Sequence, residues 1–203
     1  MKDLSLSAFT EVLASKAAVP GGGGASALAG SLAAALGEMV VNLTSGKKKF
    51  AQYEDQLSEI INELERLRTT LLDNINDDAE AFQPLAEAYA LPKDDENRDQ
   101  FMEKCLKLAA ASPMEILRNC CKVVDLLEEL KPISSKLAIS DVATGASIAQ
   151  GAIKGAAINV KVNTKLMKDI DYSSKMNEEV DNLCNVYIDK AEQIYQEIYR
   201  EMI

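Results

Sequence analysis

The feature that most constrains the fold is a long stripe of apolar residues at spacings of three and four between residues 52 and 89. Its members are Leu57, Ile60 or Ile61, Leu64, Leu67, Leu71, Ile75, Phe82, Leu85 and Tyr89. This spacing places them on one face of an α-helix and predicts an amphipathic helical region over Gln52–Tyr89. The stripe must be covered by other helices, which favours a helical bundle.

One carboxylate interrupts this stripe. Asp78 lies three residues after Ile75 and four before Phe82, whereas Asp77 falls off the stripe toward solvent. Burying a carboxylate is costly unless it is paired or has a purpose, so Asp78 is a candidate functional group. The alternative is that residues 76–78 form a break between two helices, with an Asp as N-cap.

The rest of the chain also predicts helices. Helical spacing and capping signals favour helices over residues 4–16, 25–43, 97–111, 113–130, 140–163 and 173–202. Ser112 as N-cap and Pro113 as the first helical residue predict a new helix there, and Pro84 predicts a bend or restart. We find no convincing strand or repeat. The sequence therefore predicts one all-α domain over residues 1–203, an antiparallel bundle of about seven long helices.

A proline and four glycines, residues 20–24, precede an alanine-rich run that ends near Leu43. Glycine allows close approach of another group, and a glycine turn before a helix offers free N–H groups to an anion. The alternative is a flexible turn before a tightly packed helix. The run from Ala25 to Val41 contains Glu38, serines and glycines, so we expect a central or subunit-interface helix rather than a membrane span.

Composition excludes several classes of function. The net charge of −10 disfavours binding to nucleic acid or anionic membranes. The chain has no histidine, which excludes Ser-His-Asp and Cys-His catalysis and argues against a zinc site. Four cysteines without a CxxC pair predict reduced thiols in a cytoplasmic protein, and the N-terminus does not resemble a signal peptide.

Three further polar groups have two interpretations each. Lys47–Lys49 predict either a solvated turn or a docking point for a polyanionic tail. Ser140–Asp141 open a helix, as a cap and a dipole-complementing acid or as site residues. Asn159 and Asn163 share a helix face and either read a heterocycle edge or tie helices together.

The combination of these stretches resembles the cyclodeaminase/cyclohydrolase family of folate one-carbon enzymes. The resemblance covers nearly the whole chain. It is carried by residues 19–30, Asn42–Thr44 with Lys47–Lys49, Asp78–Phe82 leading to Leu91–Lys93, Ser140–Asp141 and Asn159–Val160. Two positions depart from the family pattern: Gly24 stands where the family usually has Ser, and Asn76 where it tends to have an acid.

The resemblance implies an all-helical homodimer that binds tetrahydrofolate derivatives, with polyglutamylated folate as substrate and no metal or other cofactor. It implies Asp78 as the catalytic acid/base, and we hypothesise that Asp141 orients substrate or a second proton carrier. The substrate-binding residues would be Gly21, Gly22, Gly23, Ser26, Lys47, Lys49, Ser140, Asn159 and Asn163.

Two reactions are compatible with this resemblance. The first is hydrolysis of 5,10-methenyltetrahydrofolate to 10-formyltetrahydrofolate, which we favour because no formiminotransferase module is attached. The alternative is cyclodeamination of formiminotetrahydrofolate with release of ammonia. A non-enzymatic helical adaptor is a third interpretation, but it leaves an Asp on an apolar stripe unexplained.

Overall fold

The computed structural model describes residues 1–92 and 94–202, so Lys93 of the Leu91–Lys93 segment lies outside the described residues. Within the described ranges there is no β-strand. The helices are α1 Leu6–Leu13, α2 Gly22–Asn42, α3 Glu54–Ala90, α4 Arg98–Leu130, α5 Ile139–Thr164 and α6 Ile170–Glu201, with short 3₁₀ helices at Lys48–Tyr53 and Lys131–Ile133. The all-α prediction is confirmed.

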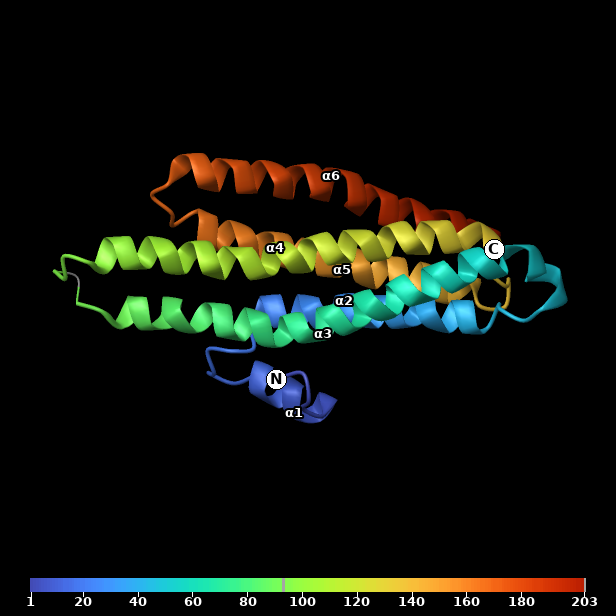
Figure 1. The fold of residues 1–203 in the computed structure, drawn as a ribbon, viewed down its shortest axis with the longest axis horizontal. Helices are drawn as coiled ribbons and strands as arrows, with labels where there is room; N and C mark the ends of the chain where they lie inside the picture. The colour runs from blue at the N-terminus through green and yellow to red at the C-terminus, as the bar shows by residue number, and fades with distance from the viewer. Residues whose placement is uncertain (93, 203) are drawn as a thin grey trace.

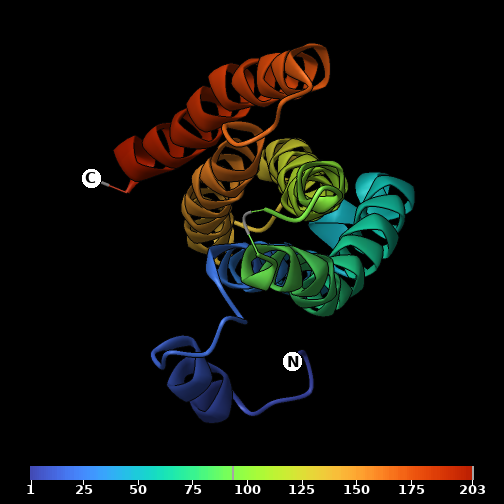
Figure 2. The ribbon, with the colours of Figure 1, turned by 90° about the vertical axis from the view of Figure 1, so that its left-hand side faces the viewer.

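Four long helices, α2 to α5, run side by side along the molecule (Figures 1 and 2). α2 packs against α5, α3 and α4, whereas α6 packs against α5 and α4 on the outside of this group. α1 lies outside the four-helix group, on the side formed by α2 and α3, in both views. The arrangement confirms an antiparallel bundle of long helices, in which α2 packs against three neighbours.

α3 follows the predicted stripe. Its apolar residues from Leu57 to Ile75 that continue the three-and-four spacing are buried, and so is Leu85. The stripe ends earlier than predicted, because Tyr89 is 50% exposed and Ala88 takes its place in the core. The helix is continuous through residues 76–78 and through Pro84, so neither the alternative of a break at 76–78 nor a restart at Pro84 is observed.

The predicted helix start at Ser112–Pro113 is wrong. α4 runs unbroken from Arg98 to Leu130 with Pro113 buried inside it, which is why the described residues hold six α-helices rather than seven. A proline inside a helix removes a hydrogen bond and costs about 3 kcal/mol. Here the carbonyl of Ala109 accepts a hydrogen bond from Asn163 Nδ2 at 3.1 Å instead.

Two other helices begin earlier than predicted. α2 begins at Gly22, so three of the four glycines form its first turn and only Gly21 is the N-cap. α6 begins at Ile170 rather than at Ser173 or Ser174, because the side chain of Asp169 accepts a hydrogen bond from the backbone N–H of Tyr172 at 3.1 Å. A polar N-cap does begin α6, as predicted, but the residue is Asp169 and not Ser173 or Ser174.

α2 is more apolar than we expected from its serines and glycines. By length and composition it is one helix that would be able to cross a membrane, with a mean hydropathy of 1.5 over 18 residues. In the bundle, 56% of that window is buried. Its packing against α3, α4 and α5 accounts for an apolar composition on several faces.

Glycines let α2 approach α3 closely at regular intervals. A Cβ at Gly30 would lie 2.6 Å from Cys120 Sγ and 3.2 Å from Leu71 Cδ1, and one at Gly37 would lie 2.8 Å from Leu64 Cδ1. Moving seven residues along α2 therefore corresponds to moving seven residues back along α3. This spacing defines an antiparallel register in which leucines of α3 fill the space left by the glycines of α2.

This register predicts the effect of adding a methyl group to α2. Gly30→Ala should lower the free energy of unfolding by about 1–3 kcal/mol, because the buried space is already filled. The matched variant is Gly151→Ala on α5, where no atom lies within 4 Å of the added Cβ. It should raise stability by about 0.5–1 kcal/mol through helix propensity. Urea unfolding of both proteins checks this, and equal effects would contradict the packing argument.

Candidate functional site

Asp78 lies in a pocket of about 140 Å³ formed where the start of α2 meets α3, α4 and α5. The pocket is lined by Ala18, Val19, Gly21, Gly22, Gly23, Asp78, Phe82, Ala109, Pro113, Asn159, Val162 and Asn163. Of the predicted site residues, it brings together Gly21, Gly22, Gly23, Asp78, Asn159 and Asn163. These residues come from segments that are far apart in the sequence, which is typical of a ligand site rather than of a local cap.

The carboxyl group of Asp78 is half-buried and its pKa is raised, chiefly because burial disfavours the charged form. The backbone N–H of Gly24 acts in the opposite direction and lowers the pKa. This N–H belongs to the first turn of α2, which has no side-chain cap of its own. The carboxylate from α3 therefore sits at the positive end of the α2 dipole, where a negative charge is favoured.

Gly23 makes room for Asp78. A Cβ at position 23 would lie 2.3 Å from Asp78 Oδ1 and 2.5 Å from its Cγ. The pair Gly23 and Asp78 continues the seven-residue register of Gly30 with Leu71 and Gly37 with Leu64. Asp78 thus occupies the place of a packing leucine in the repeat, and only a glycine opposite it leaves space for the carboxylate.

The two asparagines of α5 also face the pocket. A Cβ at Gly22 would lie 2.7 Å from Asn159 Nδ2, so this glycine makes room for the amide. Asn159 Nδ2 donates to the carbonyl of Gly155 at 2.8 Å, and Asn163 Nδ2 donates to the carbonyl of Asn159 at 2.9 Å. The prediction that both residues share one helix face is confirmed, and the amides are held by backbone carbonyls.

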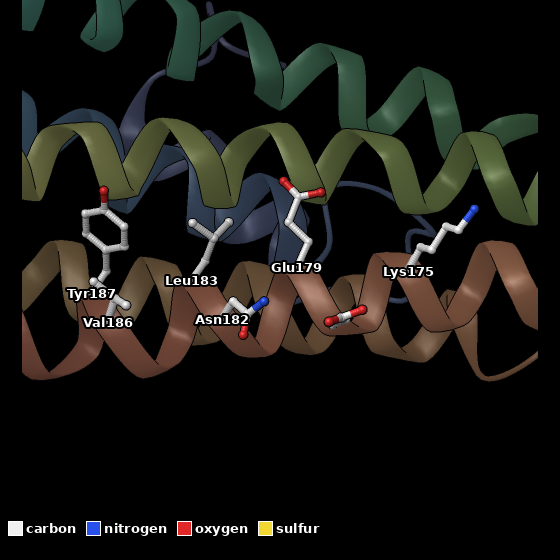
Figure 3. Close-up of a pocket in the computed structure, with 7 residues that line it drawn as sticks. Lys175, Glu179, Asn182, Leu183, Val186 and Tyr187 are labelled. Carbon is white, nitrogen blue, oxygen red and sulfur yellow. The ribbon is translucent and has the colours of Figure 1, made fainter.

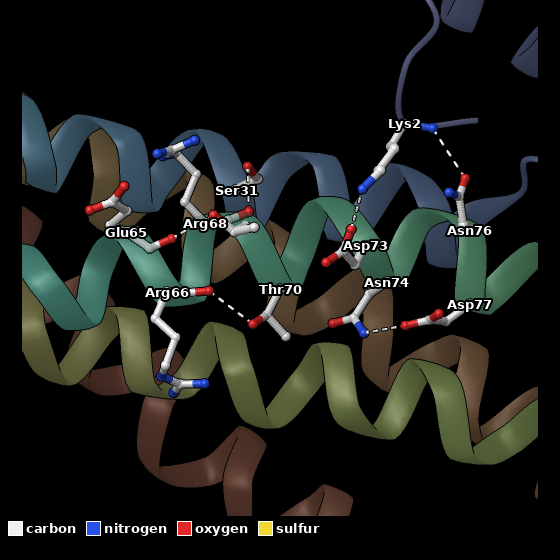
Figure 4. Close-up of polar contacts among 11 residues, drawn as sticks. Lys2, Ser31, Glu65, Arg66, Arg68, Thr70, Asp73, Asn74, Asn76 and Asp77 are labelled. Atoms are coloured by element: carbon white, nitrogen blue, oxygen red, sulfur yellow. Dashed lines mark hydrogen bonds and ion pairs between the residues drawn. The ribbon is translucent and has the colours of Figure 1, made fainter.

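Only Asp78 among residues 76–78 enters the pocket. Asn76 accepts a hydrogen bond from the backbone N–H of Lys2 at 3.2 Å, and Asp77 accepts one from Asn74 Nδ2 at 3.0 Å (Figure 4). Asn74 is buried and in turn accepts a bond from Asn119 of α4 at 3.3 Å. Asp77 therefore belongs to a polar link between α3 and α4, and Asn76 to the N-terminal segment.

The structure does not bring four other predicted site residues to this pocket. Lys47 and Lys49 are exposed beyond the C-terminal end of α2, and Ser140 and Asp141 begin α5 at the same end. Asp141 lies 18 residues before Asn159 on α5, which is about 27 Å at 1.5 Å per residue. Lys47 Nζ donates to Ser135 Oγ at 3.4 Å.

Ser26 does not line the pocket. Its Oγ is buried and donates to the carbonyl of Gly22 at 2.7 Å. A Cβ at Gly155 would lie 2.3 Å from this Oγ, so Ser26 packs against α5 through another glycine. Ser26 therefore lies between the first turn of α2 and Gly155 of α5, and its hydroxyl bonds to one of the glycines that line the pocket.

Larger hollows lie elsewhere on the molecule. One of about 450 Å³ follows α6, where Glu179, Leu183 and Tyr187 are directed toward α4 (Figure 3). Its polar groups bind α4: Arg118 Nε donates to Glu179 at 2.8 Å and Tyr187 Oη donates to Asp125 at 2.9 Å. These bonds hold α6 on the bundle and account for Glu179 and Tyr187 in the lining.

The cysteines and acidic residues of the described ranges form neither a metal-binding cluster nor a disulfide. Among the described residues, no three His, Cys, Asp or Glu side chains gather where they would be able to hold a metal ion. The four cysteines are free, and burial raises the pKa of the fully buried Cys120 thiol to about 12. A thiol with so high a pKa is a poor nucleophile at neutral pH.

Sequence reasoning missed the apolar and helix-breaking residues of the pocket wall, namely Phe82, Ala109, Pro113 and Val162. The sequence does carry a signal for how two of the predicted residues pair. Gly23, Gly30 and Gly37 repeat at seven residues, and so do Leu64, Leu71 and Asp78. Aligning the two repeats would have placed Gly23 opposite Asp78.

Together, the fold and the site define an all-α protein with a half-buried carboxyl group beside two asparagine amides in a pocket, without histidine or a metal-ligand cluster among its described residues. Residues 5–182 match the model of the family described as Formiminotransferase-cyclodeaminase. The chain belongs to this family.

Individual relatives agree with this assignment. The chain is 37% identical over 198 residues to methenyltetrahydrofolate cyclohydrolase of Methylorubrum extorquens, covering 96% of this chain and 95% of the relative. It is 33% identical over 185 residues to formimidoyltransferase-cyclodeaminase of Gallus gallus, covering 88% of this chain but 34% of that longer protein. The crystal structure of formiminotetrahydrofolate cyclodeaminase from Thermotoga maritima has a TM-score of 0.85 at 28% identity, with 98% of both chains covered.

The raised pKa of Asp78 predicts a pH-dependent effect on stability. The folded protein binds the carboxyl proton more tightly than the unfolded chain does, so the free energy of unfolding falls as pH rises from the ordinary value of 3.8 through the raised pKa. Asp78→Asn should therefore stabilise the protein at pH 7, and this gain should shrink below about pH 4.

The control is Glu80→Gln, which removes one charge from an exposed position two residues further along α3. Thermal unfolding of wild type and both variants at pH 7 and pH 4 tests the prediction. Equal shifts for Asp78→Asn and Glu80→Gln at both pH values would show that the burial of Asp78 does not affect its titration.

Proposed function

We propose that this protein is a 5,10-methenyltetrahydrofolate cyclohydrolase that produces 10-formyltetrahydrofolate. The observation that carries the proposal is Asp78, a half-buried carboxyl group with a raised pKa that faces a pocket beside two asparagines. The near full-length relationship to a protein named methenyltetrahydrofolate cyclohydrolase supports the choice of reaction.

Asp78 would act first as a base and then as an acid. The one-carbon bridge of the substrate is an amidinium-like cation, which a nearby carboxylate stabilises. Water attacks the bridge carbon while the carboxylate of Asp78 takes one proton from it. The protonated Asp78 then gives this proton to N5, the bond between N5 and the bridge carbon breaks, and the second hydroxyl proton leaves to solvent as the formyl group forms on N10. A raised pKa suits a group that must both take and return a proton.

The pterin ring would lie against the asparagines and the glycine turn. Asn159 and Asn163 provide amide oxygens, and Gly21 leaves open space at the mouth of the pocket, since no atom lies within 4 Å of a Cβ there. Gly22 and Gly23 act indirectly in this proposal, because they make room for Asn159 and Asp78. No metal or further cofactor is part of the proposed mechanism.

The second candidate is cyclodeamination of formiminotetrahydrofolate. Its support is the relationship to proteins of that name, including a solved structure of the same fold. In this reaction N10 attacks the formimino carbon, one proton leaves N10 and one joins the departing ammonia, so one carboxyl group again suffices. A purely structural adaptor is disfavoured, because it would not need a desolvated carboxyl group in a pocket.

Asp78→Asn tests the role of the carboxyl group. The amide cannot accept a proton from water, so kcat should fall by about 10²–10⁴-fold on either substrate. The measurement is a spectroscopic assay of methenyltetrahydrofolate loss run beside ammonia release from formiminotetrahydrofolate. Glu80→Gln should retain activity. Near wild-type turnover of Asp78→Asn on both substrates would refute the assignment, and the faster wild-type reaction identifies the natural one.

The pH dependence of activity gives a further check. The base must be deprotonated to accept a proton from water, so kcat/KM should fall as pH decreases through the pKa of Asp78. Because that pKa is raised, the acid limb of the profile should lie above the ordinary value of 3.8. An acid limb at or below this value would mean that another group controls the reaction.

We further propose a cytoplasmic homodimer that binds polyglutamylated folate. Leu32, Met39 and Leu43 share one face of α2 and are 48%, 39% and 48% exposed, which supports burial of this face against a second copy. A two-fold axis perpendicular to α2 would place the Lys47–Lys49 end of one chain near the pocket end of its partner. Ser140 and Asp141 would approach that pocket in the same way, and the folate tail would meet the lysines.

The proposed cytoplasmic location has a separate basis. The free thiols support a reducing compartment.

A triple change of Lys47, Lys48 and Lys49 to Ala tests tail docking. It should raise KM several-fold more for polyglutamylated than for monoglutamylated folate, because each ion pair with a tail carboxylate contributes up to about 1 kcal/mol. Leu32→Asp, which should produce a monomer in sedimentation, should cause the same selective loss. An equal rise in KM for both substrates would contradict the proposal that the lysines bind the polyglutamate tail.

A further inference from the structure

α4 contains a proline in its interior, where proline normally destabilises a helix. Pro113 is buried and lines the pocket, and α4 continues for 17 residues beyond it to Leu130. In a regular helix, the N–H of residue 113 would bond to the carbonyl of Ala109. Proline has no N–H, so this carbonyl is left without its helical partner in the wall of the pocket.

Asn163 supplies the missing donor. Its Nδ2 donates to the carbonyl of Ala109 on α4 at 3.1 Å and to the carbonyl of Asn159 on its own helix at 2.9 Å. Both partners are carbonyl oxygens, which only accept hydrogen bonds, so the group between them must be the amide nitrogen. Its two protons are both used, and the orientation of the side chain is fixed.

This orientation determines what the pocket offers to a ligand. Within the described ranges, no hydrogen bond ends on Oδ1 of Asn163 or of Asn159, whose Nδ2 donates to the carbonyl of Gly155. Together with the carboxylate of Asp78, the two amide oxygens give the pocket three acceptor groups, beside one remaining donor on Asn159 Nδ2, which makes a single bond. A ligand edge rich in N–H donors, such as the amino-substituted ring of a reduced pterin, has the complementary pattern.

Pro84 shows that a proline inside a helix does not by itself have this effect. It interrupts α3 in the same way and frees the carbonyl of Glu80. Glu80 is exposed, so water can satisfy that carbonyl, and Pro84 does not line the pocket. The two prolines therefore form a natural pair, one beside the site and one away from it.

We propose that Pro113 is a positioning residue that sets substrate specificity through Asn163. Because proline lacks an N–H, the carbonyl of Ala109 is left for the Asn163 amide, and the two bonds of Nδ2 fix the orientation in which Oδ1 is left for a ligand. As a statement about substrate recognition, the inference rests on the proposed folate function. As a statement about the orientation of Asn163, it applies to the protein without any ligand.

Kinetics of a double-mutant cycle test the recognition. In Pro113→Ala, the new N–H competes for the Ala109 carbonyl and frees the Asn163 amide to rotate. KM for 5,10-methenyltetrahydrofolate should rise about fivefold, the effect of one hydrogen bond, with kcat within about twofold. In an Asn163→Ala background, Pro113→Ala should change KM by less than about twofold, because the group it positions is gone. Pro84→Ala should leave KM and kcat unchanged.

A readout without substrate separates this inference from the proposed function. The side-chain NH₂ signals of Asn163 are assigned by ¹⁵N NMR through their loss in Asn163→Ala. They should exchange slowly in wild type and Pro84→Ala, and at least about threefold faster in Pro113→Ala, where one anchoring bond is lost.

The outcomes are distinct. Unchanged Asn163 signals in Pro113→Ala overturn the positioning role, whatever the enzyme does. The same rise in KM in both backgrounds overturns specificity through Asn163 and leaves a general packing effect. If wild type and Pro84→Ala fail on both folate substrates, the proposed function fails instead, and the NMR result alone decides whether Pro113 orients Asn163.

Discussion

The contact between Asp78 and the first turn of α2 is the interaction on which the site depends. A carboxylate approaches the backbone so closely that no side chain fits at Gly23. The backbone N–H of Gly24 and the positive end of the helix reduce the cost of burying the charge, but burial still dominates and raises the pKa. The pKa of the carboxyl group is thus raised toward the range in which a group can both accept and return a proton.

The contact between Asp78 and Gly23 results from the register in which α2 and α3 pack against each other. Gly30 with Leu71 and Gly37 with Leu64 bring α2 and α3 together, and the next pair in the series is Gly23 with Asp78. The hydrophobic repeat therefore positions the catalytic candidate, with a carboxylate where a leucine would otherwise pack. Stability and function use the same geometry, so a change in the register would displace Asp78 as well as the core.

The features that were predicted correctly from the sequence are those that depend on the periodicity of a single helix. The stripe of α3, the place of Asp78 on it and the shared face of Asn159 and Asn163 all follow from 3.6 residues per turn. The prediction failed at Ser112–Pro113, because strong capping signals do not reveal that a distant Asn163 satisfies the carbonyl that the proline frees. Periodicity also does not show which ends of helices meet, so Asp141 was grouped with Asp78 although both chain order and helix length separate them.

The size of the pocket bears on the proposed assembly. A volume of about 140 Å³ is small beside the roughly 300–1,000 Å³ of most ligand sites. In the proposed complex, one chain would enclose the pterin ring there, and the rest of the folate would extend onto the surface, where a net charge of −10 disfavours its carboxylates. Lys47–Lys49 provide a local positive patch, yet they lie about 30 Å along α2 from the pocket. A second copy that pairs the exposed face of α2 in antiparallel fashion removes this conflict, because it brings the lysine end of one chain to the acid/base end of the other.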